Sequence, residues 1–121
     1  MKTKAREIKS SLSPLILNQK NILLKIKDIK PKYEKEGLVL LGIFGSYANN
    51  TANKDSDIDI LYDVKSNHFS KKYPGFKAFT RLNEIKRELK EVFNTKVDLA
   101  TIDNHSETFK KFALKDAIYV T

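Results

Sequence analysis

The chain has 121 residues, of which 40% are hydrophobic and 31% charged, a composition typical of one globular domain. The absence of cysteine excludes disulfides, thiolate zinc sites and a cysteine nucleophile, and no apolar run is long enough for a membrane span or a secretion signal. We therefore expect a single domain over residues 1–121, located in the cytoplasm and not associated with a membrane.

The net charge of +8 is concentrated at the start of the chain, because residues 1–36 hold ten Lys and Arg against four acids. This bias suggests a solvated basic face, an acidic protein partner or a nucleic acid, in that order of preference. Aromatic residues are not interleaved with these lysines, which argues against a stacking platform for single-stranded nucleic acid.

The basic N-terminal region, residues 1–36, is expected to be helical. Residues 3–11 predict a short helix, and Ser13 followed by Pro14 predicts the start of a second one. Its apolar face would hold Leu15, Ile22, Ile26, Ile29 and Tyr33. Pro31 is expected to kink or break this helix, and Gly37 to end it.

A continuous apolar run over residues 38–44 predicts a buried strand. It leads into Gly45 and Ser46, where we expect a short helix to begin. A helix N-terminus presents free N–H groups and the positive end of its dipole, so this turn is a candidate phosphate site.

A second strand is predicted over residues 57–62, where polarity alternates. Side chains on a strand alternate between faces, so Asp57 and Asp59 would point the same way while Ile58 and Ile60 enter the core. Two carboxylates opposite a phosphate cradle would hold Mg²⁺ against a triphosphate, which indicates nucleotidyl transfer.

Simpler interpretations exist for each part, since Gly-Ser alone is often a turn and Asp-x-Asp alone a solvated strand edge. An EF-hand starting at Asp55 is excluded, because its sixth position is Ile60 rather than Gly and its twelfth is Ser66 rather than Glu. The glycine patterns of P-loop and Rossmann sites are absent from the sequence.

Residues 63–73 are polar and are expected to form a loop beside the site, with Lys71 or Lys72 as a candidate triphosphate contact. His68 and His105 have no metal-ligand spacing and are not expected to act in catalysis. A long helix is predicted from Pro74 to Asn94. Its apolar stripe is expected to be entirely core: Phe76, Phe79, Leu82, Ile85, Leu89, Val92 and Phe93.

A third acid, Asp98, lies in a short predicted strand over residues 96–101. Val97 and Leu99 would share the core face, leaving Asp98 on the other face beside the small Ala100. Pairing of this strand with residues 57–62 would bring three carboxylates together around two divalent ions. Their mutual repulsion predicts cation dependence, and Asp98 is the best candidate to accept the proton of an incoming hydroxyl.

The chain ends with a predicted helix over residues 106–115, with Phe109, Phe112 and Ala113 inward, and a final strand in which Ile118 and Val120 alternate. Helices and strands thus alternate along the chain with short connections. This order predicts the α/β class, with a small mixed sheet packed against helices.

The motif as a whole is Gly45-Ser46, then Asp57 and Asp59, then Asp98 on a later strand. It resembles the polymerase-β-type nucleotidyltransferase superfamily. Within that superfamily, the short chain is similar to the minimal nucleotidyltransferases, which act as antitoxins to HEPN-domain ribonuclease toxins.

The resemblance implies the nucleotidyltransferase fold and transfer of AMP from ATP to a hydroxyl, a tyrosine of the HEPN toxin, which silences the ribonuclease. Gly45 and Ser46 would hold the β- and γ-phosphates. Asp57 and Asp59 would hold Mg²⁺, and Asp98 would bind a second Mg²⁺ and act on the acceptor hydroxyl.

The similarity covers residues 38–120, the expected catalytic core, and departs from the family pattern at Asn49 and Asn50, where a basic residue and a glycine are usual. Asparagine tolerates the left-handed conformation, so the turn at Asn50 is expected to survive. Two alternatives stay open: a transferase for a small hydroxylated molecule, and an antitoxin that neutralises by binding alone. The two asparagines favour binding alone, whereas the three aspartates oppose it.

Overall fold

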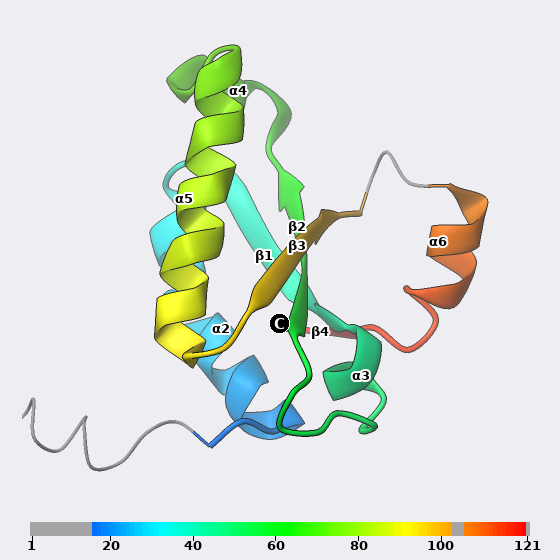
Figure 1. Cartoon of the computed structure of the whole chain (residues 1–121). Helices are drawn as coiled ribbons and strands as arrows, with labels where there is room; N and C mark the ends of the chain where they lie inside the picture. Colours follow the sequence, from blue (N-terminus) through cyan, green and yellow to red (C-terminus); the bar gives the residue numbers. More distant parts are fainter. Residues whose placement is uncertain (1–15, 103–105, 121) are drawn as a thin grey trace, which may run out of the picture.

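Four strands form one sheet in the order β3-β2-β1-β4 (Figure 1). The computed structural model describes residues 16–102 and 106–120. The strands are β1 (Leu38–Phe44), β2 (Ile58–Val64), β3 (Val97–Thr101) and β4 (Ile118–Tyr119). The helices are α2 (Gln19–Glu34), α3 (Gly45–Ala48), α4 (Ser66–Lys72), α5 (Phe76–Phe93) and α6 (Glu107–Phe112). The predicted α/β class with a small mixed sheet is confirmed.

The sheet is mixed because β1 runs antiparallel to both β2 and β4, whereas β2 and β3 are parallel. The parallel pair is joined by the crossover through α4 and α5, as parallel strands require. In β1 the register shifts between Leu40 and Gly42, a bulge that leaves Leu41 without a partner on β2. On its other edge the Leu41 carbonyl accepts a hydrogen bond from Val120 N at 2.8 Å.

Helices α2 and α5 cover one face of the sheet, and α6 lies on the other side (Figure 1). The core between the sheet, α2 and α5 includes fully buried aliphatic residues from each layer: Ile22, Ile26, Leu38, Leu40, Ile43, Ile58, Ile60, Ile85 and Leu89. On the α6 side, the ring of Phe44 packs edge-on against Phe109 with a centroid distance of 5.6 Å. The predicted inward positions of Ile58 and Ile60 are therefore confirmed.

The first described helix differs from the prediction in two respects. It begins at Gln19 rather than near Pro14, because Asn18 is its N-cap and accepts a hydrogen bond from Asn21 N at 2.8 Å. Pro31 does not break it. The helix continues to Glu34, since a proline in the last turn removes only one hydrogen bond. The helix predicted over residues 3–11 lies outside the described residues. Ser13, the predicted N-cap of the second helix, lies outside them as well.

The predicted loop over residues 63–73 is wrong, because β2 continues to Val64 and α4 follows. Phe69 is buried and anchors this short helix to the core. The long helix starts at Phe76 and ends as predicted at Asn94, which adopts the left-handed conformation. Its first two aromatic residues are not core, as described below.

An ion cluster ties α5 to the segment between α2 and β1. Arg81 donates to both carboxylate oxygens of Glu36, at 2.6 and 2.7 Å, and to Glu88 at 2.9 Å. Tyr73 and Tyr33 donate to the same two acids, and the Arg81 hydrogen bonds hold the pKa of Glu36 below its usual range. Such bidentate, partly buried pairs fix geometry better than exposed ones. Over the described residues, no helix has the length and apolarity that crossing a membrane would require.

Candidate active site

Gly45 begins α3 at the carboxyl end of β1, as the sequence predicts. Its φ of +72° suits glycine, and a Cβ at this position would overlap Oδ2 of Asp59. The turn is closed by hydrogen bonds from Asn49 N to the Gly45 carbonyl at 3.1 Å and from Thr51 N to the Ser46 carbonyl at 2.9 Å. The backbone of Gly45 thus lies directly against an acidic side chain.

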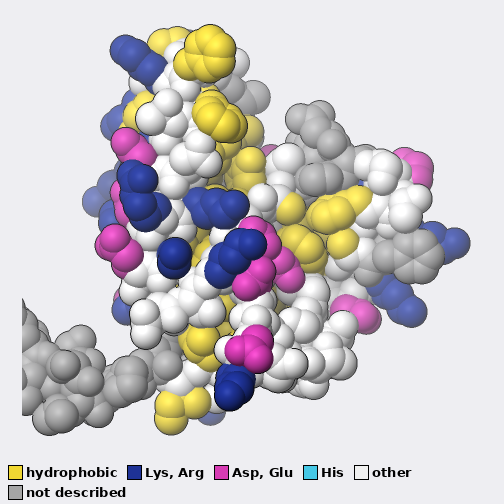
Figure 2. Space-filling view, in the orientation of Figure 1, with side chains coloured by type: hydrophobic (Ala, Val, Ile, Leu, Met, Phe, Trp, Pro, Cys, Tyr) yellow, Lys and Arg dark blue, Asp and Glu magenta, His cyan; other side chains and the backbone are white. Residues whose placement is uncertain are grey.

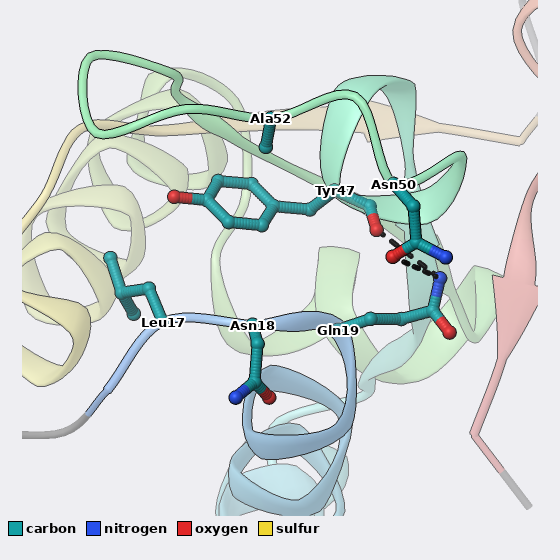
Figure 3. Close-up of a pocket in the computed structure, with 6 residues that line it drawn as sticks. All are labelled: Leu17, Asn18, Gln19, Tyr47, Asn50 and Ala52. Carbon is teal, nitrogen blue, oxygen red and sulfur yellow. Dashed lines mark hydrogen bonds between the residues drawn. The ribbon is translucent and has the colours of Figure 1, made fainter.

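The C-terminal end of α3 is held by Gln19, the first residue of α2 (Figure 3). Its amide nitrogen donates to the carbonyl of Ala48 at 2.8 Å. The same nitrogen donates to the carbonyl of Tyr47 at 3.3 Å, a bond drawn in Figure 3. The same nitrogen lies 3.5 Å from Oδ1 of Asn50, whose φ of +62° confirms the predicted left-handed turn. Sequence reasoning missed Gln19, because nothing in the sequence marks it as a partner of residues about 30 positions away.

These contacts border a hollow of about 140 Å³ between α2 and the segment after α3 (Figure 3). The hollow is lined by Leu17, Asn18, Gln19, Tyr47, Asn50 and Ala52. The Tyr47 ring is buried, and it crosses between Leu17 and Ala52 in this view.

The three predicted acids are brought to one end of the sheet. Asp57 immediately precedes β2, and Asp59 lies within it as the Cα partner of Phe44. Asp98 is the Cα partner of Asp59 across the parallel β2–β3 ladder. Figure 2 shows acidic side chains gathered in the middle of this face, with basic side chains beside them.

The pKa of Asp59 reflects the closeness of the other two carboxylates. Burial, followed by the negative charges of Asp98 and Asp57, raises the pKa of Asp59 to about 6. Carboxylates that repel one another in this way are stabilised by a cation between them.

Two lysines that sequence reasoning missed lie against these acids. Lys86 Nζ of α5 is 3.5 Å from Asp98 Oδ1, and Lys96 Nζ is 3.7 Å from Asp57 Oδ2. Lys96 could have been found from the sequence, because it stands two residues before Asp98 and so shares its strand face. Lys86 carries no such signal, since α5 contains several exposed lysines.

The donor set fits a divalent cation in its chemistry: three carboxylates of hard oxygen donors. Among the residues that the structure describes, however, no group of three or more Asp, Glu, His or Cys side chains converges to hold a metal. Asp57 and Asp98 contact lysine ammonium groups instead, and these cations offset part of the negative charge.

The structure does not bring the predicted basic contacts to this site. His68 packs beside Gly37, at the Leu38–Val64 end of the β1–β2 pair, whereas Asp59 lies at the opposite end. Lys72 lies near Glu36, whose pKa it helps to lower. Since Lys71 precedes it in the same helical turn, neither lysine is placed to contact a triphosphate at Gly45. His105 lies outside the described residues.

Comparison with known proteins gives a consistent result. The family described as "Polymerase beta, Nucleotidyltransferase" matches residues 24–121. A Methanocaldococcus jannaschii protein named "Putative protein adenylyltransferase MJ1379" is 38% identical over 103 residues, covering 84% of this chain and 93% of the relative. "Protein adenylyltransferase MntA" of Thermococcus cleftensis is 30% identical, covering 81% of this chain and 95% of the relative.

A solved structure described as "Structure of putative minimal nucleotidyltransferase" aligns with a TM-score of 0.61 at 20% identity. The alignment covers 84% of this chain and 95% of that one. This likeness shows that the two chains share a fold.

Proposed function

The chain belongs to the polymerase-β nucleotidyltransferase family, and from this premise we propose that it is a protein adenylyltransferase that uses ATP and Mg²⁺. The observation that carries the proposal is the register of the sheet, which pairs Asp59 with Asp98 and sets Gly45 against Asp59. The names of both relatives quoted above contain the words "protein adenylyltransferase". These names support a protein acceptor over a small molecule.

Transfer of AMP joins an acceptor oxygen to the α-phosphorus of ATP and breaks the bond from that phosphorus to pyrophosphate, which leaves. Asp98 accepts the proton of the acceptor hydroxyl. The backbone at Gly45 and Ser46 binds the β- and γ-phosphates, and catalysis comes mainly from positioning and charge neutralisation.

Asp57 and Asp59 would hold a Mg²⁺ ion, and Asp98 would share a second one. When bound, Mg²⁺ supplies neutralisation of the triphosphate charge and a lower pKa of the acceptor hydroxyl.

The acceptor we propose is a tyrosine of a cognate HEPN-domain ribonuclease, which AMP attachment silences, so that the chain acts as an antitoxin. The relative named "Protein adenylyltransferase MntA" supports a protein acceptor, and the choice of a HEPN tyrosine rests on the family resemblance of the sequence motif. A second candidate is neutralisation by binding alone. The ion pairs of Asp57 and Asp98 with lysines favour it, since they occupy the same carboxylates that catalysis needs.

Intact mass spectrometry of the HEPN-domain protein, before and after incubation with this chain and MgATP, tests the proposal. We expect a gain of one or more AMP units that is lost with Asp57→Asn/Asp59→Asn. The matched control is Asp55→Asn, an exposed acid in the preceding turn, which should leave transfer intact. A stable complex without a mass gain would favour binding alone, and loss of the gain in the control would remove the specific role of the pair.

A further inference from the structure

Two aromatic side chains at the start of α5 are exposed to solvent although the helical pattern marks them as core. Phe76 is 89% exposed and Phe79 is 66% exposed. Together with Gly75 they line a surface hollow of about 440 Å³ (Figure 2, the hydrophobic side chains at the top of α5). Neighbouring exposed phenyl rings on one helical turn are a common feature of contact surfaces.

The aromatic pair continues into a basic surface along the same side of α5. At 100° per residue, six residues share one flank of this helix, which we term the α5 flank: Phe76, Phe79, Asn83, Lys86, Arg87 and Lys90. Two acids of the helix, Glu84 and Glu88, lie toward Arg81, which donates to both. A third, Glu91, stands one turn after Arg87 at the edge of the α5 flank. The six residues of the α5 flank are therefore apolar, polar or positive, and one carboxylate of the same helix, Glu91, stands at the edge of the flank.

The α5 flank leads directly to the catalytic acids. Lys86 contacts Asp98 at 3.5 Å, and seven residues of helix separate it from Phe79, a rise of about 10 Å. Figure 2 shows this arrangement on one face of the molecule. Hydrophobic side chains lie at the top of the helix, basic side chains lie below them, and acidic side chains lie beside the basic ones. A macromolecule that covers the aromatic pair can therefore also reach Asp98.

We propose that the α5 flank is the docking surface for the protein that accepts AMP, an inference that rests on the proposed function. Its partner surface has an apolar groove for the two phenyl rings, rimmed by Asp and Glu side chains that pair with Arg87 and Lys90. Docking there presents the acceptor hydroxyl to Asp98. A nucleic acid would match the positive charges but would gain little from the apolar hollow.

The test measures binding without nucleotide, so that it is separate from transfer. The HEPN-domain protein is immobilised, and biolayer interferometry gives its Kd for the wild-type chain, for Phe76→Ser/Phe79→Ser and for Arg87→Glu/Lys90→Glu. The control is Ile16→Ser/Leu24→Ser, which removes two other exposed apolar side chains, one in the segment before α2 and one within α2. Circular dichroism and ATP binding by each variant establish that the fold and the nucleotide site are intact.

We expect the Kd to rise at least 30-fold for the phenylalanine variant and at least 10-fold for the charge reversal, with the control within twofold of wild type. Unchanged binding by the phenylalanine variant, or no binding by the wild type, would overturn the docking surface. A change from dimer to monomer in light scattering, with partner binding unchanged, would overturn it in favour of self-association. Absence of AMP incorporation with intact, flank-dependent binding would instead overturn only the proposed transfer.

Discussion

The backbone of Gly45 lies so close to the Asp59 carboxylate that no side chain fits between them. Gly45→Ala should therefore both strain the left-handed backbone and displace Asp59. We expect a loss of about 2–3 kcal/mol in the free energy of unfolding and a fall in AMP transfer of about 100-fold. Chemical denaturation and the transfer rate measure the two effects.

Gly75→Ala is the matched control. Gly75 also has a positive φ, +62°, but a Cβ there meets no atom within 4 Å. This variant should lose only the backbone part of the free energy of unfolding, about 1 kcal/mol. An equal loss of unfolding free energy in the two variants would show that a side chain at position 45 does not displace Asp59.

The raised pKa of Asp59 predicts a pH-dependent stability. Between the ordinary carboxyl value near 4 and about 6, the folded state binds more protons than the unfolded state, so stability falls as pH rises through this window. Without added metal, Asp59→Asn should be more stable than wild type above pH 6, by about 1 kcal/mol after allowance for partial exposure. The difference should vanish below pH 4.

Thermal denaturation from pH 3.5 to 8 in the presence of a chelator measures this difference, with Asp55→Asn as the control. A constant difference across the range would show that the charge of Asp59 is not its cause.

The ion pair of Lys96 with Asp57 predicts competition with divalent cations. Lys96→Gln removes a positive charge 3.7 Å from Oδ2 of Asp57, so the affinity for Mn²⁺ should rise by about twofold to fivefold. Isothermal titration without nucleotide gives the value, and Lys77→Gln, on the first turn of α5, is the control. Weaker Mn²⁺ binding would indicate instead that Lys96 holds Asp57 in position.

Gln19 is expected to stabilise α3 from outside. Gln19→Ala removes the hydrogen bonds to the carbonyls of Tyr47 and Ala48 and should cost about 1–2 kcal/mol. Hydrogen exchange of the amides from Ser46 to Thr51 should accelerate, and KM for ATP should rise. Asn21→Ala, which loses a single side-chain hydrogen bond from α2 to the Ile16 carbonyl in the preceding segment, should leave this exchange unchanged.

The strands and the placement of the three acids could be predicted from the sequence because they follow local rules. Because side chains alternate along a strand, the buried Ile58 and Ile60 place Asp59 on the opposite face of the sheet. The buried Val97 places Asp98 on that same face by the same rule. The roles of these acids in catalysis stay predictions. Their pairing with Lys86 depends on how α5 crosses the sheet, which no local pattern contains.

The prediction that the whole apolar stripe of α5 is buried in the core is wrong at the N-terminal end of the helix, for a geometric reason. Eighteen helical residues span about 27 Å, whereas the five residues of β3 span about 17 Å. Ile85, Leu89 and Phe93 contact the core, but Phe76 and Phe79 extend beyond it. Helical periodicity identifies the apolar face of a helix. It does not show how far along that face the sheet extends.

The bulge at Leu41 has a consequence for changes in chain length. Before it Leu40 pairs with Tyr62, and after it Phe44 pairs with Asp59; if Leu41 were paired with Leu61 instead of bulged, Phe44 would pair with Ile58. Because a slip of one residue turns each side chain to the other face, Gly45 would then meet the wrong side of β2. Deleting Leu41 would therefore close the bulge and keep Phe44 opposite Asp59, whereas adding a residue between Gly42 and Phe44 would change that pairing. The exposed segment after Asn50 can gain or lose residues without changing which strand positions meet.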